Sequence, residues 1–209
     1  MSLRLNGSTS GYVEIDAPAV AGSNTLILPD GNGTSGQYLQ TNGSGGLSWA
    51  TLPASGKILQ VVQAEKTDTA SFSASSGNYD TFLSASITPS STASKILILW
   101  TSNASSSSID QRMAFRVLRN TIAVGVGDSA GSRISAGIGN LTNGTTGTAE
   151  AASQIILDSP NTTAPTTYNL QISCETGGGT VYINRSSSDN DANTFYRSAS
   201  HLTLMEVAA

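Results

Sequence analysis

Short runs in which apolar and polar residues alternate, separated by turn-forming clusters, extend through most of the chain. In residues 112–118, Met113, Phe115 and Val117 fall on one side of a strand, and residues 168–175 alternate in the same way. Such alternation is typical of antiparallel strands that turn one face to a core and the other to water. No stretch of about twelve residues keeps a helical period with capping residues at its ends. The pattern therefore predicts an all-β protein.

The C-terminal part holds a series of segments with the length and composition of strands, divided by breaker-rich turns. The expected strands are 58–64, 80–88, 95–101, 112–118, 121–126, 153–157, 168–175, 180–184 and 201–207. Many short strands without helices are typical of a sandwich or jelly roll. We expect residues 57–209 to form a jelly-roll-like antiparallel β-sandwich. Residues 95–100 are apolar on both faces, so this strand is either central in the sandwich or packed against another subunit.

The first fifty residues have a different character. Strand-length apolar runs at 12–15, 25–28, 38–40 and 47–49 alternate with clusters of Gly, Ser, Asn, Thr and Pro. The segment is too short and too poor in large apolar residues to bury a core of its own. It must therefore complete its core with other copies of itself or with a partner. We expect residues 1–52 to be an attachment or shaft segment, 53–56 a linker and 57–209 a separate domain.

Composition excludes several classes of partner. Charged residues make up 11% of the chain and hydrophobic residues 38%, which argues against disorder. The net charge is −4, so the chain lacks the basic face that nucleic-acid binding requires. No apolar run approaches the length of a membrane span, and the N-terminus has no apolar signal-peptide core. We expect no nucleic-acid partner, no membrane insertion and no cofactor.

Signatures of catalysis are missing from the sequence. There is no G-x-S-x-G elbow, no P-loop and no HExxH metal motif. The single cysteine, Cys174, falls on the apolar side of its strand, which favours a buried inert thiol over a nucleophile activated by His201. A glycan-cleaving enzyme needs two neighbouring carboxylates. The carboxylates that are close together in sequence lie in polar segments, but a pair contributed by two different strands remains an alternative. We expect a protein that is not an enzyme.

Aromatic and arginine side chains are the candidates for recognition. Tyr79, Phe195 and Tyr196 lie at loop–strand junctions, where they could stack on sugar rings or instead pack in the core or an interface. Arg112 and Arg116 share a strand face by parity. They could form a solvated strand edge or an intersubunit ion pair, or their guanidinium groups could bind an acidic sugar.

Two loops carry further polar candidates. Asp189, Asp191 and Asn193 match the start of a calcium loop, but the next position lacks the glycine and position 200 lacks the glutamate of an EF-hand. The two remaining interpretations are an irregular cation site and a polar loop with Asx turns. Of these we favour the polar loop, and we expect no metal. Asp128 and Arg133 flank a Gly- and Ser-rich loop. We expect a structural turn there, in which the two side chains could pair, and not a catalytic pair.

Residues 11–51 resemble a segment of bacteriophage tail-fibre-like proteins, especially those of phages that infect marine cyanobacteria. The motifs GYVEI at 11–15, LP at 28–29, GQYLQ at 36–40 and LSW at 47–49 carry the resemblance. Residues 57–209 resemble the C-terminal knob of many phage fibres, through the stretches 56–63, 88–97, 127–133 and 202–207. The resemblance implies a β-sandwich that forms homotrimers.

The resemblance also implies a role. A fibre subunit of this kind would be made in the host cytoplasm and become part of the virion. Residues 1–52 would bind other tail or baseplate proteins, and the knob would bind a host surface glycan or protein. The alternatives are a structural capsid or tail decoration fibre without receptor binding, and a small polysaccharide depolymerase.

Overall fold

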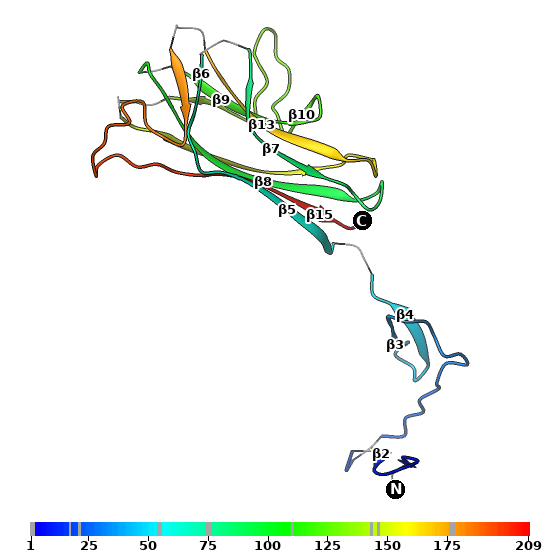
Figure 1. Ribbon diagram of the computed structural model, residues 1–209. Coiled ribbons are helices and arrows are strands. Elements are labelled where there is room, and N and C mark those ends of the chain that lie inside the picture. Colours follow the sequence, from blue (N-terminus) through cyan, green and yellow to red (C-terminus); the bar gives the residue numbers. More distant parts are fainter. Residues whose placement is uncertain are drawn as a thin grey trace. The chain divides into compact units, whose positions relative to one another are not determined.

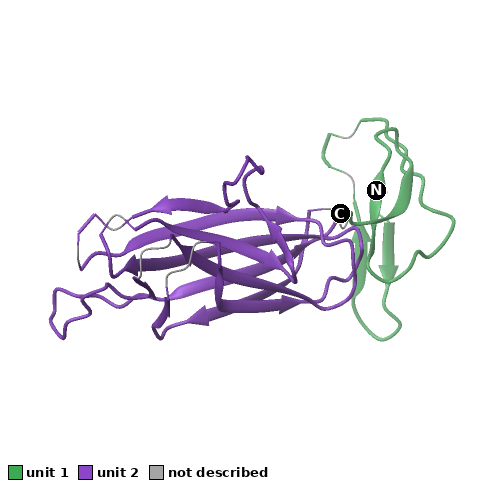
Figure 2. Cartoon of the chain, turned by 90° about the horizontal axis from the view of Figure 1, so that it is seen from above, with its two compact units in different colours: residues 1–53 green, residues 54–209 purple. Residues whose placement is uncertain are grey.

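The computed structural model describes residues 3–16, 18–20, 22–53, 56–73, 77–109, 111–142, 144–145, 147–175 and 179–209. The chain divides into two compact units, residues 1–53 and residues 54–209, called unit 1 and unit 2 (Figure 2). Of the expected linker 53–56, residues 54–55 lie outside the described part.

Unit 2 consists of two antiparallel sheets packed face to face (Figure 1). The six-stranded sheet contains β5 (Ile58–Lys66), β6 (Ala70–Ser73), β8 (Lys95–Ser106), β12 (Glu150–Asp158), β14 (Thr180–Ile183) and β15 (Ser200–Val207). The five-stranded sheet contains β7 (Asp80–Ile87), β9 (Met113–Arg119), β10 (Ile122–Val124), β11 (Ile138–Leu141) and β13 (Thr166–Cys174). From β6 to β9 and from β12 to β14 the chain alternates between the sheets, as in jelly rolls. The described residues contain no helix, so the predicted all-β antiparallel sandwich is confirmed.

The core lies between the two sheets and is built by the alternation seen in the sequence. On β8, Ile96, Ile98 and Trp100 point inward and are almost fully buried. Trp100 meets Phe115 of the opposite sheet, with ring centroids 5.3 Å apart. Fully burying such aromatic side chains is worth roughly 1.5–3 kcal/mol each. Cys174 is buried too, as expected for an inert thiol.

Hydrogen bonds identify the end of unit 2 at which the chain enters it. The Gly56 amide donates to the Ala208 carbonyl at 2.7 Å, which places the start of unit 2 beside the end of β15. Glu206 of β15 accepts hydrogen bonds from Gln60 of β5 and from Ser90, just after β7. We call this the entry end. The opposite end, where β5 ends at Lys66 and β15 begins, is called the far end.

The outer face of the six-stranded sheet carries an apolar patch toward the entry end, beside polar side chains such as Gln63 and Thr203, which are hydrogen-bonded at 2.8 Å. The strand registers align Val61, Met205, Leu97 and Leu157 in one row across β5, β15, β8 and β12. Ile155 lies beside this row, opposite Leu99 on β8. Ile155 is 71% exposed, Val61 56% and Leu157 55%. The six residues Val61, Leu97, Leu99, Ile155, Leu157 and Met205 are called the apolar outer face. The two-faced apolar pattern of 95–100 thus belongs to a central strand with one face uncovered in the single chain.

The outer face of the five-stranded sheet is polar instead. Side chains of neighbouring strands form hydrogen-bonded pairs across it, including Ser84–Asn169 at 2.7 Å and Ser86–Thr167 at 2.7 Å. Gln171 of β13 donates to Thr81 at 2.8 Å and accepts from Arg116. Hydroxyl and amide pairs of this kind keep their hydrogen bonds while facing water, so this face needs no further cover.

Unit 1 contains two small antiparallel hairpins, β1 (Leu3–Asn6) with β2 (Tyr12–Ile15) and β3 (Gln37–Thr41) with β4 (Leu47–Thr51). The expected strand at 25–28 does not form, and only Ile27 makes a β-bridge, to Gly46. The Trp49 indole donates to the Gly31 carbonyl at 2.6 Å. A Cβ on Gly33 would lie 2.7 Å from the indole, so only glycine fits there.

The apolar side chains of unit 1 remain uncovered in the single chain. None of its described residues is buried, and Val13 is 66% and Leu28 70% exposed. A fold of this size without a core needs further cover to be stable. That this segment completes its core with other copies of itself or with a partner stays a prediction.

Candidate functional site

A cavity of about 620 Å³ opens at the far end of unit 2, beside the five-stranded sheet. Its walls come from the start of β7, the start of β9, the end of β13 and the loop between β10 and β11. Tyr79 and Arg112, two of the sequence-predicted recognition residues, both line it. We call it the Tyr79 cavity. Its volume falls in the range of small-ligand sites.

Arg112 is held at the cavity by Glu175. Its guanidinium donates to the Glu175 carboxylate at 2.9 Å, and the Arg112 amide donates to the same carboxylate at 3.2 Å. Glu175 in turn donates its amide to the Arg112 carbonyl at 3.0 Å. The Arg112 side chain stays 62% exposed. The pair links the end of β13 to the start of β9 within one chain.

Arg116 supports Tyr79 from one side. Its guanidinium lies 3.8 Å from the centre of the Tyr79 ring, and its Nε donates to Gln171 at 2.9 Å. Such a cation–π contact fixes the ring in place. Burial raises the pKa of the Tyr79 hydroxyl, although Arg116 acts in the opposite direction, so the phenol stays neutral. Arg116 is therefore a support for the cavity wall and not one of its lining residues.

The loop between β10 and β11 closes the other side. Asp128 and Arg133 line the cavity, and the loop is held by the Gly127 amide, which donates to the Ala136 carbonyl at 3.1 Å. The expected Asp128–Arg133 pair does not occur among the ion pairs of the described residues. Arg133 donates to the Ala130 carbonyl instead, at 3.2 Å. Both charged groups can thus reach a ligand.

Phe195 and Tyr196 lie elsewhere, at a second cavity of about 340 Å³ that is also at the far end. Arg185 lines this cavity and lies 3.9 Å above the ring of Tyr182. Tyr196 is 82% exposed, so its ring is accessible to a partner. The five sequence-predicted recognition residues therefore fall into two groups, with Tyr79, Arg112 and Arg116 at the Tyr79 cavity and Phe195 and Tyr196 at the second cavity.

Ion pairs occupy the Asp189 loop. The Asp189 carboxylate accepts from Arg197 at 2.6 and 3.1 Å and lies 3.3 Å from Arg185. Two guanidinium groups beside one carboxylate neutralise the charge that a cation would need. Within the described ranges, no three His, Cys, Asp or Glu residues gather as metal ligands. Asp191 and Asn193 are exposed loop residues.

The thiol of Cys174 lies against the Tyr79 cavity but is only 3% exposed. Burial, with a smaller effect from the nearby Glu175 charge, raises the pKa of this thiol to about 11. His201 lies in the other sheet, where it faces Glu65 at 3.9 Å. The thiol is therefore protonated at neutral pH, and the imidazole is not its partner.

Sequence analysis missed several lining residues, among them Asn140, Ser135 and Ser173. Asn140 adopts a left-handed φ of 58°, which asparagine tolerates better than most residues. Nothing in the local pattern marks these side chains, because the cavity forms only when the loop folds back along β9.

No family model matches the chain, and no curated protein matches it. Among solved structures, the chain is similar to T=1 particles derived from infectious bursal virus, with a TM-score of 0.42 and 16% identity over 98% of this chain and 44% of that chain. It is also similar to the VP2 subviral particle of infectious bursal disease virus, with a TM-score of 0.38 and 13% identity over 95% of this chain and 44% of that chain. The chain thus spans less than half the length of these proteins. Among the described residues there is no helix of the length and apolarity needed to span a membrane.

Proposed function

We propose that this chain is a non-enzymatic subunit of a bacteriophage tail fibre. Unit 1 joins the fibre to other tail or baseplate proteins of the virion, and unit 2 binds a glycan or protein on the host surface. The resemblance of residues 11–51 and 57–209 to phage fibre proteins supports the assignment to a fibre.

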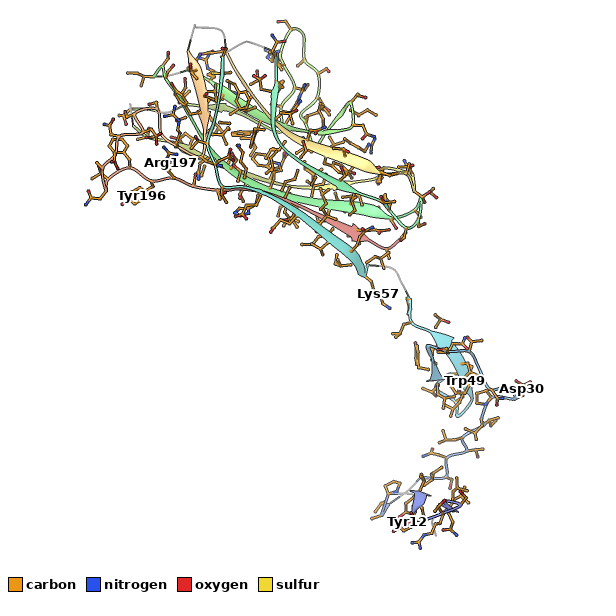
Figure 3. All side chains as sticks on the ribbon, in the orientation of Figure 1. Tyr12, Asp30, Trp49, Lys57, Tyr196 and Arg197 are labelled. Atoms are coloured by element: carbon orange, nitrogen blue, oxygen red, sulfur yellow. The ribbon has the colours of Figure 1, made fainter. Side chains whose placement is uncertain are left out.

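The observation that carries the binding role is that the two ends of unit 2 differ. The chain enters at one end, where Gly56 pairs with Ala208, and both cavities lie at the opposite end. Figure 3 shows Lys57 and Tyr196 at opposite ends of this unit. A head that is held at one end and carries its cavities at the other is arranged to present them outward.

Assembly into a homotrimer is the second part of the proposal. The apolar outer face of unit 2 and the uncovered side chains of unit 1 both need cover, and copies of the same chain supply it for both at once. Three cavities on one fibre then bind together, which raises a weak single-site affinity by avidity.

Replacing Ile155 with arginine should weaken this assembly, because it places a charge in the apolar outer face. We expect the variant trimer to dissociate at a protein concentration at least about tenfold higher than that at which the parent trimer dissociates. Sedimentation over a dilution series measures the shift. Ile122→Arg is the matched control, since Ile122 is 57% exposed on β10, outside that face. Equal behaviour of both variants would place the interface elsewhere.

The binding role is tested with the full chain, purified and labelled, on cells of the host. It should bind the cell surface and block adsorption of the phage that carries it, as a species with the mass of three chains. A trimer that neither binds cells nor blocks adsorption would instead favour the structural decoration fibre. Thinning of a host polysaccharide by the purified protein would favour the depolymerase.

A further inference from the structure

We propose that the Tyr79 cavity binds a neutral, hydroxyl-rich sugar residue. This inference rests on the proposed function and deepens it, because it assigns the ligand class of one of the two cavities at the far end.

Among the described residues, the charged side chains that line the cavity balance one another. Arg112 and Arg133 supply two positive charges, and Asp128 and Glu175 supply two negative charges. Arg112 and Glu175 are already paired at 2.9 Å. A ligand with a net charge would therefore gain from one remaining group and be repelled by the other. A neutral ligand meets no such opposition, so the charge balance argues against an acidic sugar.

The same side chains suit hydroxyl groups. A carboxylate accepts two or more hydrogen bonds, and a guanidinium donates several, so Asp128 and Arg133 can together bind hydroxyls as donors and as acceptors. Asn140 adds an amide that does both. Hydrogen bonds to charged groups are stronger than those between neutral groups, which lets a small polyol compete with water.

Beside Ser135 and Ser173, the other walls are formed by apolar side chains and glycines. Tyr79 is fixed by Arg116, and Ala114, Ile134 and Ala136 add small apolar surface beside the polar groups. A sugar ring has the matching combination of C–H faces and hydroxyl edges. Burial of such faces against aromatic and aliphatic carbon is the usual complement to a few well-placed polar groups in ligand sites.

Glycine keeps the cavity open at one wall. Gly127 lines it, and a Cβ built there would meet no atom within 4 Å. Its backbone does not have the left-handed φ that a side chain would strain. A larger residue at 127 is therefore compatible with the fold, and its side chain would lie in open space next to the cavity. This gives a way to fill the site without removing a contact.

The test uses the full chain and measures binding of glucose, galactose, mannose, N-acetylglucosamine and glucuronate by calorimetry. We expect at least one neutral sugar to bind, and Gly127→Leu to weaken it at least about tenfold. Gly144→Leu is the matched control, because Gly144 also has open space around its Cβ position but does not line the cavity. The control should bind like the parent, and both variants should keep the parent's melting temperature.

Asp128→Asn should change the affinity for neutral and for acidic sugars in opposite directions. Loss of the carboxylate should weaken a neutral sugar, since a strong acceptor is removed, whereas it should strengthen an acidic one by removing repulsion. Binding of glucuronate alone, tighter binding by Asp128→Asn, or equal binding by Gly127→Leu and the parent would overturn the proposal. So would the absence of neutral sugar binding up to about 50 mM. If the protein still binds host cells in that case, the proposed function stands and only the ligand class is wrong.

Discussion

Replacing Asp158 with alanine should lower the free energy of unfolding of unit 2 by about 3 kcal/mol. Asp158 ends β12 in one sheet and accepts hydrogen bonds from Arg119 of β9 at 2.8 and 2.9 Å and from the Tyr168 hydroxyl of β13 at 2.7 Å. The carboxylate therefore ties the two sheets together. Its removal leaves a largely buried guanidinium and a fully buried hydroxyl without their partner, and such loss is among the costliest single changes.

Urea denaturation at one protein concentration measures this effect. Asp80→Ala, which removes an exposed carboxylate at the start of β7, is the control and should change stability by less than about 0.5 kcal/mol. Tyr168→Phe should cost about 1 kcal/mol, because Asp158 keeps its stronger partner. Burial, with the Asp158 carboxylate beside it, raises the pKa of Tyr168, so its hydroxyl remains a donor at ordinary pH. Equal stability of Asp158→Ala and Asp80→Ala would show that the pair does not hold the sheets.

Acid should destabilise unit 2 through Glu206. This carboxylate is fully buried and accepts hydrogen bonds from Gln60 at 2.6 Å and from the Ser90 amide and hydroxyl at 2.7 and 2.6 Å. Burial acts to raise the pKa of Glu206, but these hydrogen bonds outweigh it and lower the pKa from 4.5 to about 2. A carboxyl whose pKa is lowered by folding stabilises the protein above its unfolded pKa. That contribution, about 3 kcal/mol, is lost as the pH falls from 4.5 toward 2.

The comparison of the parent with Glu206→Gln isolates this contribution from the other carboxyls. At neutral pH the variant should be about 2 kcal/mol less stable, because an amide cannot accept all the hydrogen bonds that the carboxylate accepts. Between about pH 5 and pH 2 the difference should shrink, since the parent loses its advantage when Glu206 is protonated. Glu65→Gln, an exposed glutamate on the adjacent β5, should show no such convergence. A pH-independent difference for Glu206→Gln would contradict the assignment.

Alternation predicted the strands that bury one face. β9, β13 and β15 are found within two residues of their expected bounds, because the core selects every second side chain. β6 escaped prediction because its sequence, ASFS, is short and mostly small. β11 escaped because Gly139 and the left-handed Asn140 break the alternation, and its pairing with β9 shifts register between Ile138 and Leu141.

Residue types at the candidate site were predictable, but their grouping was not. The alternation along β9 correctly predicted that Arg116 lies on the outer face. By the same alternation Arg119 lies on the opposite face, where it pairs with Asp158 and is separated from Arg112 and Arg116. The contact of Arg116 with Tyr79 depends on the registers of β7 with β13 and of β13 with β9. Those registers are set by packing across the whole sheet, which no local pattern encodes. For the proposed assembly, the residues themselves carry two signals, the two-faced segment 95–100 and the coreless segment 1–52.

The Gly56 amide donates to the Ala208 carbonyl, and the Ala208 amide donates to the Lys57 carbonyl at 2.9 Å. These bonds join the first and last residues of unit 2 at one end, so the unit can be exchanged as a module. β5 begins and the antiparallel β15 ends at the entry end, so the first and last residues of unit 2 lie side by side there. If unit 2 is the proposed binding head, recombination at the entry end would exchange the whole head and leave unit 1 untouched, and transplanting residues 56–209 as one cassette would carry its binding specificity along. A fluorophore or tag fused after Ala209 would sit away from both cavities, because these lie at the far end.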